Sequence, residues 1–452
     1  MIEQSNEPNT RELLEQVLDD LEAGRQEALS QSLESAHPAE VADLLESLPP
    51  GPRSDLWEAV APDQEGEILS HLHEEVRTSI IEEMDHAELL AAAESLAPED
   101  LAEIVETLPE DLTASLLQAM EEDHRHRVEQ VLNFEEGTAG RLLSTEVVSV
   151  RKDVSLAVVL RWLRRHESLP RHTDALMVID EQGLYLGKLD VGDLLTGNPD
   201  LLVAAVMQED VSTVQARDSE LAVATLFDRR DLISVAVVDD EGRLLGRITI
   251  DDIVDVIREE SDRVLLNSAG LDAEEDMFAP VLHSAQRRGL WLGVNLVTVF
   301  AAAWVIGRFE EALEKLVALA VLMPIVASMG GIAGSQTLTL TIRGLALGQI
   351  ASSNVRWLLY KEIMVGALNG LVWALVVALL AFVWFRNPGI ALIIACAMLL
   401  NLLAAALSGI SIPLILRRLG IDPALSGAVI LTTVTDVVGF LSFLGLATLF
   451  LL

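Results

Sequence analysis

The sequence predicts a multidomain membrane protein with an all-α superhelical N-terminal domain, a tandem α/β pair, a connecting helix and a transmembrane domain of five α-helices. Three observations predict this fold class. Residues 1–276 hold 64 of the 70 acidic residues and 21 of the 31 basic ones, a net charge of −43. Within this acidic region a segment recurs after 59 residues, and beyond it the chain is almost continuously apolar. Because so dense a polyanion repels nucleic acid and attracts divalent cations, we expect no nucleic-acid partner.

Residues 1–135 have the pattern of short amphipathic helices separated by prolines. The segments HPAEVADLLESLPP, from His37, and APEDLAEIVETLPEDL, from Ala97, resemble each other. In each, a proline opens a helix with acidic residues in its first turn, aliphatic residues recur at three- and four-residue spacing, and a second proline ends the element. Repeats of this kind bury a core only between neighbours, so we expect a helical superhelix that docks or senses a ligand.

Residues 136–258 contain an internal repeat, with its halves at about 136–200 and 201–258. ALMVIDEQGLYLGKLDVGDLL, from Ala175, aligns with SVAVVDDEGRLLGRITIDDIV, from Ser234. Each copy has the pattern of a buried strand, a tight turn, a second strand and a helix opened by an aspartate, and a further helix precedes the strands. This order resembles a tandem pair of CBS domains, which are β-α-β-β-α modules that pack into a pseudo-twofold disc.

CBS pairs often bind adenine nucleotides through a Thr/Ser-x-x-Asp motif whose carboxylate accepts hydrogen bonds from the ribose. Thr249 and Asp252 match this motif in the second copy, whereas the first copy has Asp190 in place of the hydroxyl residue. The resemblance therefore implies at most one nucleotide site, with ATP as a regulatory ligand. The alternative is a helix cap in which Asp252 has only a structural role.

Five apolar stretches beyond the acidic region are long enough to cross a hydrocarbon core, which takes about 20 helical residues. Seven flanking Lys and Arg residues lie on the side of the acidic region and three on the opposite side, which predicts that the N-terminus is inside and the C-terminus outside. The N-terminus has no basic and apolar leader pattern, so we expect no cleavable signal peptide. A connecting helix at 259–286, with a break at Gly270, would transmit movement to a transmembrane domain at 287–452. The stretches are 289–307, 316–341, 358–385, 389–416 and 424–452.

Two features within the apolar stretches are candidates for an ion pathway. Asp436 is a carboxylate in a membrane span, which is costly and usually functional, although it can also simply bond to neighbouring helices. The run MGGIAGSQ, from Met329, follows Pro324 and predicts a loosened helix whose carbonyls line a cavity. The alternative for this run is close packing of helices through small residues.

The order of the regions, with PIVASMGGIAGSQ in the second span and DPALSGAVILTTVTDVVG at the fifth, resembles the MgtE family of bacterial magnesium channels over nearly the whole chain. The resemblance implies a homodimer in the bacterial inner membrane, a pore on the twofold axis, and connecting helices that act as plugs. It implies that Asp436 of each subunit forms the ion site, with backbone carbonyls near Gly330 and Ala428 beside it. Glu310 and Glu314 would draw cations to the outer mouth.

The resemblance also implies a regulatory cation site in the acidic region. Intracellular Mg²⁺ would screen carboxylates shared among the superhelix, the CBS pair and the plug, and so hold the channel shut. Clustered like charges approach closely only with a counter-ion, so low Mg²⁺ would let these domains separate. Asp252 thereby has two predicted roles, one with metal and one with nucleotide. The matching positions are Glu99, Glu103, Asp231, Asp252, Asp255 and Glu260.

The chain departs from the family pattern at three places. Ile332 and Ser335 replace asparagines that are usual in the second-span motif, a change that bears on selectivity among divalent ions. The fifth-span motif reads SGAV, from Ser426, where the family often has SGPF. On the plug, Arg263 and Val264 replace an acidic pair, which would weaken gating by Mg²⁺. A nearby acidic run can compensate, and it consists of Asp272, Glu274, Glu275 and Asp276.

We therefore predict a Mg²⁺-selective channel with passive influx that intracellular Mg²⁺ shuts, and Co²⁺ or Mn²⁺ as further ions. Oxygen ligands suit Mg²⁺, which dehydrates reluctantly, and no soft ligand for copper or zinc accompanies them. The alternatives are a coupled Mg²⁺/Co²⁺ carrier and a non-transporting membrane sensor of Mg²⁺ or nucleotide. The sequence has no nucleophile–base pair, no phosphate-binding glycine loop with a lysine and no His/Cys cluster, so we predict no enzymatic activity.

Overall fold

The computed structural model describes residues 10–166, 168–209, 211–271, 275–351 and 353–451. The chain divides into two compact units. The first consists of Met1–Ser261 with Glu274–Pro280, and the second of Asp262–Ala273 with Val281–Leu452. The acidic helices and strands lie in the first unit and the long apolar helices in the second, so the division follows the charge split of the sequence.

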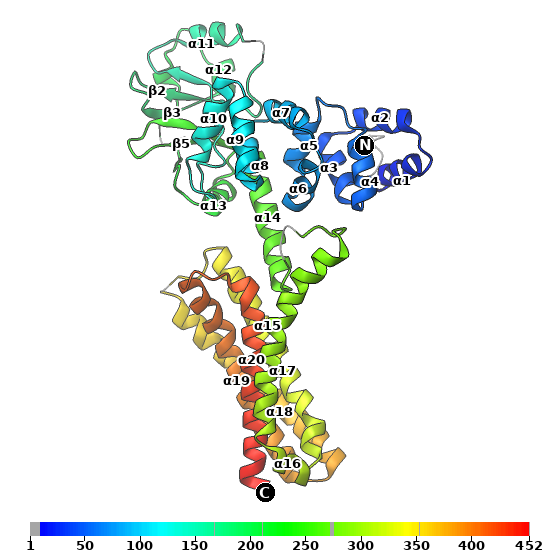
Figure 1. Cartoon of the computed structure of the whole chain (residues 1–452). Helices are drawn as coiled ribbons and strands as arrows, with labels where there is room; N and C mark the ends of the chain where they lie inside the picture. Colours follow the sequence, from blue (N-terminus) through cyan, green and yellow to red (C-terminus); the bar gives the residue numbers. More distant parts are fainter. Residues whose placement is uncertain (1–9, 167, 210, 272–274, 352, 452) are drawn as a thin grey trace, which may run out of the picture. The chain divides into compact units, whose positions relative to one another are not determined.

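The first unit begins with helices α1 to α10, which share one apolar core (Figure 1). Pro38 and Pro98 occupy the first positions of α3 and α8. Proline is favourable there because the N–H at the first position of a helix has no hydrogen-bond acceptor within the helix. His37 and Glu40 complete a capping box at the start of α3. The predicted proline-opened helices and superhelix are thus confirmed. The helices are α1 (Thr10–Glu22), α2 (Gln26–Ser35), α3 (Pro38–Glu46), α4 (Pro50–Trp57), α5 (Glu65–His71), α6 (Glu74–Ile81), α7 (His86–Ser95), α8 (Pro98–Thr107), α9 (Glu110–Ala119) and α10 (Glu122–Leu132).

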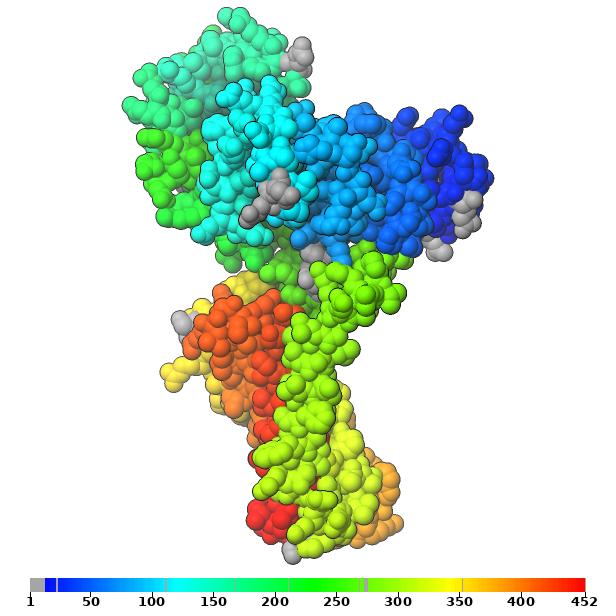
Figure 2. Space-filling view, in the orientation of Figure 1, coloured from blue at the N-terminus to red at the C-terminus, as the bar shows by residue number. Residues whose placement is uncertain are grey.

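Two three-stranded sheets follow and confirm the predicted tandem pair. Each sheet has a parallel pair of strands followed by an antiparallel pair, in the order β1-β2-β3 and β4-β5-β6. In the space-filling view, this pair and the blue and cyan helices form one continuous surface (Figure 2). The elements are β1 (Ser149–Arg151), α11 (Leu156–Leu163), β2 (Ala175–Ile179), β3 (Tyr185–Asp190), α12 (Val191–Thr196), the 3-10 helix η1 (Val203–Ala205), β4 (Thr213–Gln215), α13 (Glu220–Arg230), β5 (Ser234–Val238), β6 (Leu244–Thr249) and α14 (Ile250–Ser268).

The matched glycines of the repeat mark where the two copies exchange segments. A Cβ on Gly187 would lie 2.1 Å from the carbonyl oxygen of Gln208, and a Cβ on Gly246 would lie 2.3 Å from that of Ser144. Gln208, near the start of the second half, pairs with Lys188 of the first, whereas Ser144, near the start of the first half, pairs with Arg247 of the second. Glycine is needed at both positions because another backbone passes against them.

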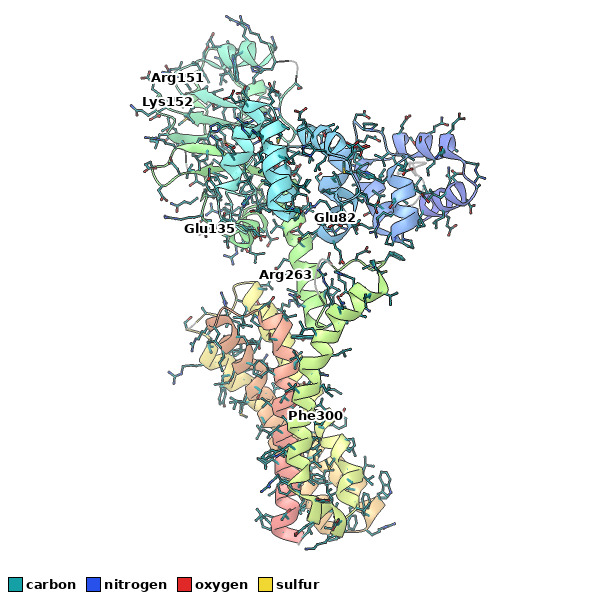
Figure 3. The ribbon with its side chains drawn as sticks, viewed as in Figure 1. Glu82, Glu135, Arg151, Lys152, Arg263 and Phe300 are labelled. Atoms are coloured by element: carbon teal, nitrogen blue, oxygen red, sulfur yellow. The ribbon has the colours of Figure 1, made fainter. Side chains whose placement is uncertain are left out.

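Five helices of the second unit are long and apolar enough to cross a membrane, in agreement with the five predicted stretches. The first of them begins at Val281, eight residues before the predicted stretch, and carries exposed apolar side chains such as Phe300 (Figure 3). A short helix, α16, precedes the second. They are α15 (Val281–Gly307), α16 (Glu310–Lys315), α17 (Ala318–Ala346), α18 (Val355–Phe385), α19 (Pro388–Arg418) and α20 (Pro423–Leu451).

The connecting segment is divided between two helices. α14 ends at Ser268 and α15 begins at Val281. Gly270 stops α14 because its φ of +75° is left-handed, and the N–H of Leu271 then donates back to the carbonyl of Leu266. The turn packs against Trp291 of α15, whose ring would collide with any Cβ on Gly270. Local turn chemistry thus places a tight corner within the segment predicted at 259–286.

Candidate functional site

An acidic cluster joins helix α8 to helix α14 in the first unit. Carboxylates at one turn of α8 lie near carboxylates at the start of α14, so that they raise one another's pKa. The cluster includes four of the predicted regulatory residues and adds Asp100 and Asp251, which the sequence analysis did not single out. Like charges at such spacing repel unless protons or cations neutralise them. Its members are Glu99, Asp100, Glu103, Asp251, Asp252 and Asp255.

The carboxyl groups at the centre of this acidic cluster hold protons unusually tightly. Burial raises the pKa of Glu99 to about 7, and the charge of Asp252 adds to the rise. Burial likewise raises the pKa of Asp100 to about 7, with further contributions from Glu99 and Asp252. The Oε2 atom of Glu99 is buried and has no hydrogen-bond partner among the described residues. A buried carboxylate oxygen without a donor is a position that a proton or a hydrated cation would stabilise.

Not every carboxylate of the acidic cluster is free to bind a cation. Burial raises the pKa of Asp252 to about 6, although its Oδ2 accepts from the N–H and the hydroxyl of Thr249, at 3.0 and 3.1 Å. Glu103 pairs with the buried Arg77, at 2.6 Å. Burial also raises the pKa of Asp255, while His71 and Arg258 lower it. The charge of the cluster therefore depends on neighbouring basic side chains as well as on pH.

The raised pKa values predict that docking of α8 onto α14 depends on pH. An acid whose pKa is higher in the docked state favours docking below its ordinary pKa, and this contribution is lost as the pH rises through the docked value. Without divalent cations, docking should therefore be strongest below about pH 5 and weaken towards pH 7 and above. A spin-label distance between α8 and α14 in the full chain, measured from pH 5 to 8, checks this. A distance that stays constant over this range contradicts the prediction.

Two predicted regulatory residues lie apart from this cluster. Asp231 is exposed and ends α13 with a φ of 51°, and Glu260 lies two turns beyond Asp252 along α14. Within the described ranges, no three His, Cys, Asp or Glu side chains converge on a position suited to a bare metal ion. The metal-binding role of the acidic cluster, of Asp231 and of Glu260 stays a prediction.

The predicted nucleotide residues cap a helix in the structure. Thr249 immediately precedes α14, and its hydrogen bonds to Asp252 are those of a helix N-terminus. A separate cavity of about 670 Å³ lies beside the first copy of the tandem pair. Its lining includes residues 145–149 and 168–171 with Trp162 and His166, but neither Thr249 nor Asp252. The nucleotide role of these two residues stays a prediction.

A buried ion pair fixes the segment that leads into α15. Arg53 donates to Asp276 at 2.8 Å, and the two side chains are only 3% and 4% exposed. Arg53 also donates to the carbonyl oxygens of Leu45 and Leu48, and the N–H of Asp276 donates to Glu75. Of the acidic run predicted to compensate for Arg263 and Val264, Asp272 and Glu274 lie outside the described residues, and Asp276 is committed to this pair. Arg263 is exposed on α14 (Figure 3).

In the second unit, α20 presents a stripe that contains the predicted pore carboxylate. Ala428, Thr432 and Asp436 are spaced by four residues, so they share one face of the helix. Asp436 is half-buried, and its side chain makes no hydrogen bond or ion pair within the described ranges of the chain. The carbonyl of Ala428 already accepts from the Thr432 hydroxyl, at 3.1 Å. An unpartnered carboxylate within a membrane helix needs a cation, water or another chain beside it.

The glycine run of α17 packs helices instead of loosening one. α17 is continuous from Ala318 to Ala346 through Pro324 and both glycines, so the predicted loosening is wrong. Gly330 faces Asn401 of α19, and Gly334 faces Leu431 of α20. Small residues let helices pack closely within a membrane, where the hydrophobic effect does not drive helices together. Ile332 and Ser335 are exposed on α17, and Glu310 and Glu314 are exposed on α16.

Two buried polar residues of the second unit escaped sequence analysis. Asn401 in α19 is completely buried and donates to the carbonyl oxygen of Val326, at 2.8 Å. Glu362 in α18 is 5% exposed, accepts from the Thr337 hydroxyl at 3.1 Å, and pairs with Lys361 at 2.8 Å. The signal for both was a polar residue inside an apolar stretch, the same signal that singled out Asp436.

Three comparisons with known proteins match these regions of the chain. Family models match at residues 323–446 (MgtE, divalent cation transporter), 36–137 (MgtE intracellular N domain) and 203–259 (CBS domain). The magnesium transporter MgtE of Thermus thermophilus is 33% identical over 331 residues, which cover 72% of this chain and 73% of that protein. That of Bacillus subtilis is 30% identical over 326 residues, 72% of each chain. A crystal structure of the cytosolic domain of the Mg²⁺ channel MgtE in complex with ATP aligns with a TM-score of 0.49 and 31% identity, covering 53% of this chain and 98% of that one. The chain therefore belongs to the MgtE family of divalent cation transporters.

Proposed function

We propose that this protein is a Mg²⁺ channel that conducts passive influx and is shut by intracellular Mg²⁺. The observation that carries the proposal is the half-buried Asp436, which has no partner among the described residues and lies on one face of α20 with Thr432 and Ala428. A carboxylate on a helix face that also carries a hydroxyl group suits a hydrated hard cation, because Mg²⁺ prefers oxygen ligands and keeps most of its water. Co²⁺ and Mn²⁺, which also accept oxygen and water ligands, are the further ions we expect to pass.

A homodimer would complete the pore. In a single chain the Asp436 stripe is partly exposed on a membrane helix, where contact of a carboxylate with lipid costs about 3 kcal/mol by insertion scales. A second copy facing the stripe would enclose the two carboxylates in an aqueous path instead. Cysteine cross-linking along α20 in native membranes tests this arrangement, and an absence of any α20–α20 cross-link argues against it.

The charges at the ends of the helices support the proposed orientation. Arg343 and Arg417 lie in the last turns of α17 and α19, and Arg356 lies at the start of α18, all on the side predicted to be cytoplasmic. We therefore place the protein in the bacterial inner membrane, surrounded by lipid, with its N-terminus in the cytoplasm and its C-terminus outside. Protease protection of tags at the two ends in spheroplasts tests this orientation.

The acidic cluster supports the proposed gate. Burial raises the pKa of Glu99, Asp100 and Asp252, and the charge of Asp252 adds to the cost of ionising the other two. Mg²⁺ held with its water shell would neutralise them and favour docking of α8 on α14. The last turn of α14 also bonds to the membrane domain, because Asn267 donates to Asp422 at 3.1 Å, just before α20 begins. A movement of α14 would thus reach the helix that carries Asp436.

Neutral side chains in the acidic cluster should close the channel without Mg²⁺. In the variant Glu99→Gln/Asp100→Asn the repulsion that opens the cluster is removed, so flux should be low at every cytoplasmic Mg²⁺ concentration. The measurement is Mg²⁺ influx into proteoliposomes while Mg²⁺ on the cytoplasmic face is varied. Glu82→Gln is the matched control, because Glu82 is exposed and lies outside the cluster (Figure 3). Permanently open channels in the double variant would instead mean that Mg²⁺ bridges these carboxylates directly.

A coupled carrier is the second candidate, and Glu362 is the observation that favours it. This carboxylate is buried among membrane helices and bonded to Thr337, which is a common setting for a group that exchanges protons. A carrier would move Mg²⁺ against its own gradient when a pH or Na⁺ gradient is imposed, and a channel would not. Uphill Mg²⁺ accumulation that is lost in Glu362→Gln would replace the channel proposal.

We further propose ATP as a regulatory ligand of the tandem CBS pair, through Thr249 and Asp252. The support is the matching motif in the second copy and the position of Asp252 in the acidic cluster, where a nucleotide and Mg²⁺ would compete. Calorimetric titration of ATP into the detergent-solubilised chain tests this, with Thr249→Val as the variant. Equal ATP affinity of the wild type and Thr249→Val would place a nucleotide elsewhere.

A further inference from the structure

Asn401 is a completely buried polar side chain at a crossing of three membrane helices. Its Nδ2 donates to the carbonyl oxygen of Val326 on α17, and its Oδ1 is buried with no hydrogen-bond donor among the described residues. An unsatisfied buried acceptor costs about 1–3 kcal/mol, more than one interhelical hydrogen bond of about 0.6 kcal/mol returns in a membrane. Stability alone therefore does not explain an asparagine at this position.

Two helices place a glycine against this amide. A Cβ on Gly330 of α17 would lie 2.2 Å from Nδ2 of Asn401, and a Cβ on Gly439 of α20 would lie 2.9 Å from the same atom. By contrast, a Cβ on Gly331 or on Gly445 would meet nothing within 4 Å. The amide thus acts as a spacer whose width sets how closely α17 and α20 approach.

The same two helices carry the proposed ion site. Gly330 is one of its predicted residues, and Gly439 lies three residues after Asp436, about one turn along α20. We infer that Asn401 is a positioning residue that sets the separation of α17 and α20 at the ion site and thereby selects among divalent cations. It does so as a spacer between the two glycines and as a clamp on the Val326 carbonyl. The inference rests on the proposed function.

The physical reason concerns the size and stiffness of the site. Mg²⁺ requires a compact octahedral shell, whereas Ca²⁺ accepts wider and more irregular shells. If Asn401 holds α17 and α20 at a fixed distance, the ion site keeps the size that suits one hydrated ion. Removing the amide frees α17 to shift, which costs selectivity before it costs the fold, because cores tolerate repacking with loss of rigidity first.

The test measures Mg²⁺ and Ca²⁺ influx separately in proteoliposomes of full-length variants. Asn401→Ala should lower the Mg²⁺-to-Ca²⁺ flux ratio by about tenfold or more, since a misplacement of the order of 1 Å can change a rate about 100-fold. Gly330→Ala alone should cut Mg²⁺ influx because its methyl group collides with the amide. In Gly330→Ala/Asn401→Ala the collision is gone, so influx should return to the level of Asn401→Ala. The control Gly445→Ala should behave as the wild type, because its methyl group would meet nothing within 4 Å.

Several outcomes would overturn this role for Asn401. One is an unchanged flux ratio in Asn401→Ala together with lower influx of both ions and a lower melting temperature, which describes a purely structural residue. Another is a Gly330→Ala defect that persists when Asn401 is also alanine. If Asn401→Ala does not fold, Gly439→Ala against Gly445→Ala tests the same contact from α20. Asp436→Asn, run in parallel, separates the two proposals, because full Mg²⁺ influx in that variant refutes the pore itself.

Discussion

Replacing Asp436 by asparagine is expected to lower Mg²⁺ influx by about 100-fold. Each carboxylate contributes about 1.5–3 kcal/mol through charge-assisted hydrogen bonds to the water shell of the ion, and a loss of about 2.7 kcal/mol corresponds to a factor of about 100. Asparagine keeps the shape of the side chain and removes only the charge. The side chain has no protein partner among the described residues, so the substitution breaks no internal contact there. Isotopic ²⁵Mg²⁺ influx into proteoliposomes at low cytoplasmic Mg²⁺ is the measurement.

The conservative variant Asp436→Glu is the control for this result, because it keeps a carboxylate on the same face of α20. It should retain more influx than Asp436→Asn at equal protein stability, as judged by thermal unfolding in detergent. Heterodimers made by co-expressing the wild type with Asp436→Asn should conduct less than half as well as the wild type if both subunits line one pore. Influx in Asp436→Asn that matches the wild type would place the ion path elsewhere in the membrane domain.

Replacing Arg53 by methionine is expected to destabilise the first unit by about 3–5 kcal/mol, which is the usual cost of removing one partner of a buried ion pair. The carboxylate of Asp276, only 4% exposed, would be left without its cation, and the carbonyl oxygens of Leu45 and Leu48 would each lose a donor. Urea unfolding of the full chain in detergent, followed by the loss of structure in the acidic unit, measures the change.

Two further variants make this second result specific. In Arg53→Met/Asp276→Leu an apolar pair replaces the ionic one, so most of the lost stability should return. Arg151→Met removes an exposed arginine at the end of β1 that pairs with the exposed acids Asp153 and Glu181, and it should leave the urea midpoint unchanged (Figure 3). Equal destabilisation by Arg53→Met and Arg151→Met would contradict the assignment of a buried, stabilising pair.

The secondary structure and the order of the domains were readable from the sequence because they follow from local rules. Proline at the first position of α3 and α8, the 59-residue repeat, and the apolar stretches are all patterns of spacing within a short segment. Four of the six members of the acidic cluster were predicted, but from the resemblance to the family and not from local spacing. Glu99 and Asp252 matched a family pattern, but Asp100 had no such match, and its role depends on the burial that packing of α8 against α14 creates.

Tertiary packing changed one local prediction and completed another. Pro324 and the glycine pair were expected to loosen the second span, yet α17 stays continuous because α19 and α20 press against its glycines. The connecting segment was expected to break at Gly270, and α14 does end there, but the packing of the following turn on Trp291 was not predictable from the sequence. In both cases the structural role of a glycine depends on the distant side chain that packs against it.

The sequence by itself therefore determined the domains of this protein, its five membrane helices and Asp436 as a candidate pore carboxylate, because periodicity, composition and a lone charge in an apolar stretch are properties of neighbouring residues. Only the tertiary structure decided the partners of the other buried polar groups. Arg53 meets Asp276 across 223 residues, Asn401 meets Val326 across 75, and Glu362 meets Thr337 across 25. A polar group is stable in an apolar interior only with a partner, and the fold, not the local sequence, brings that partner to it.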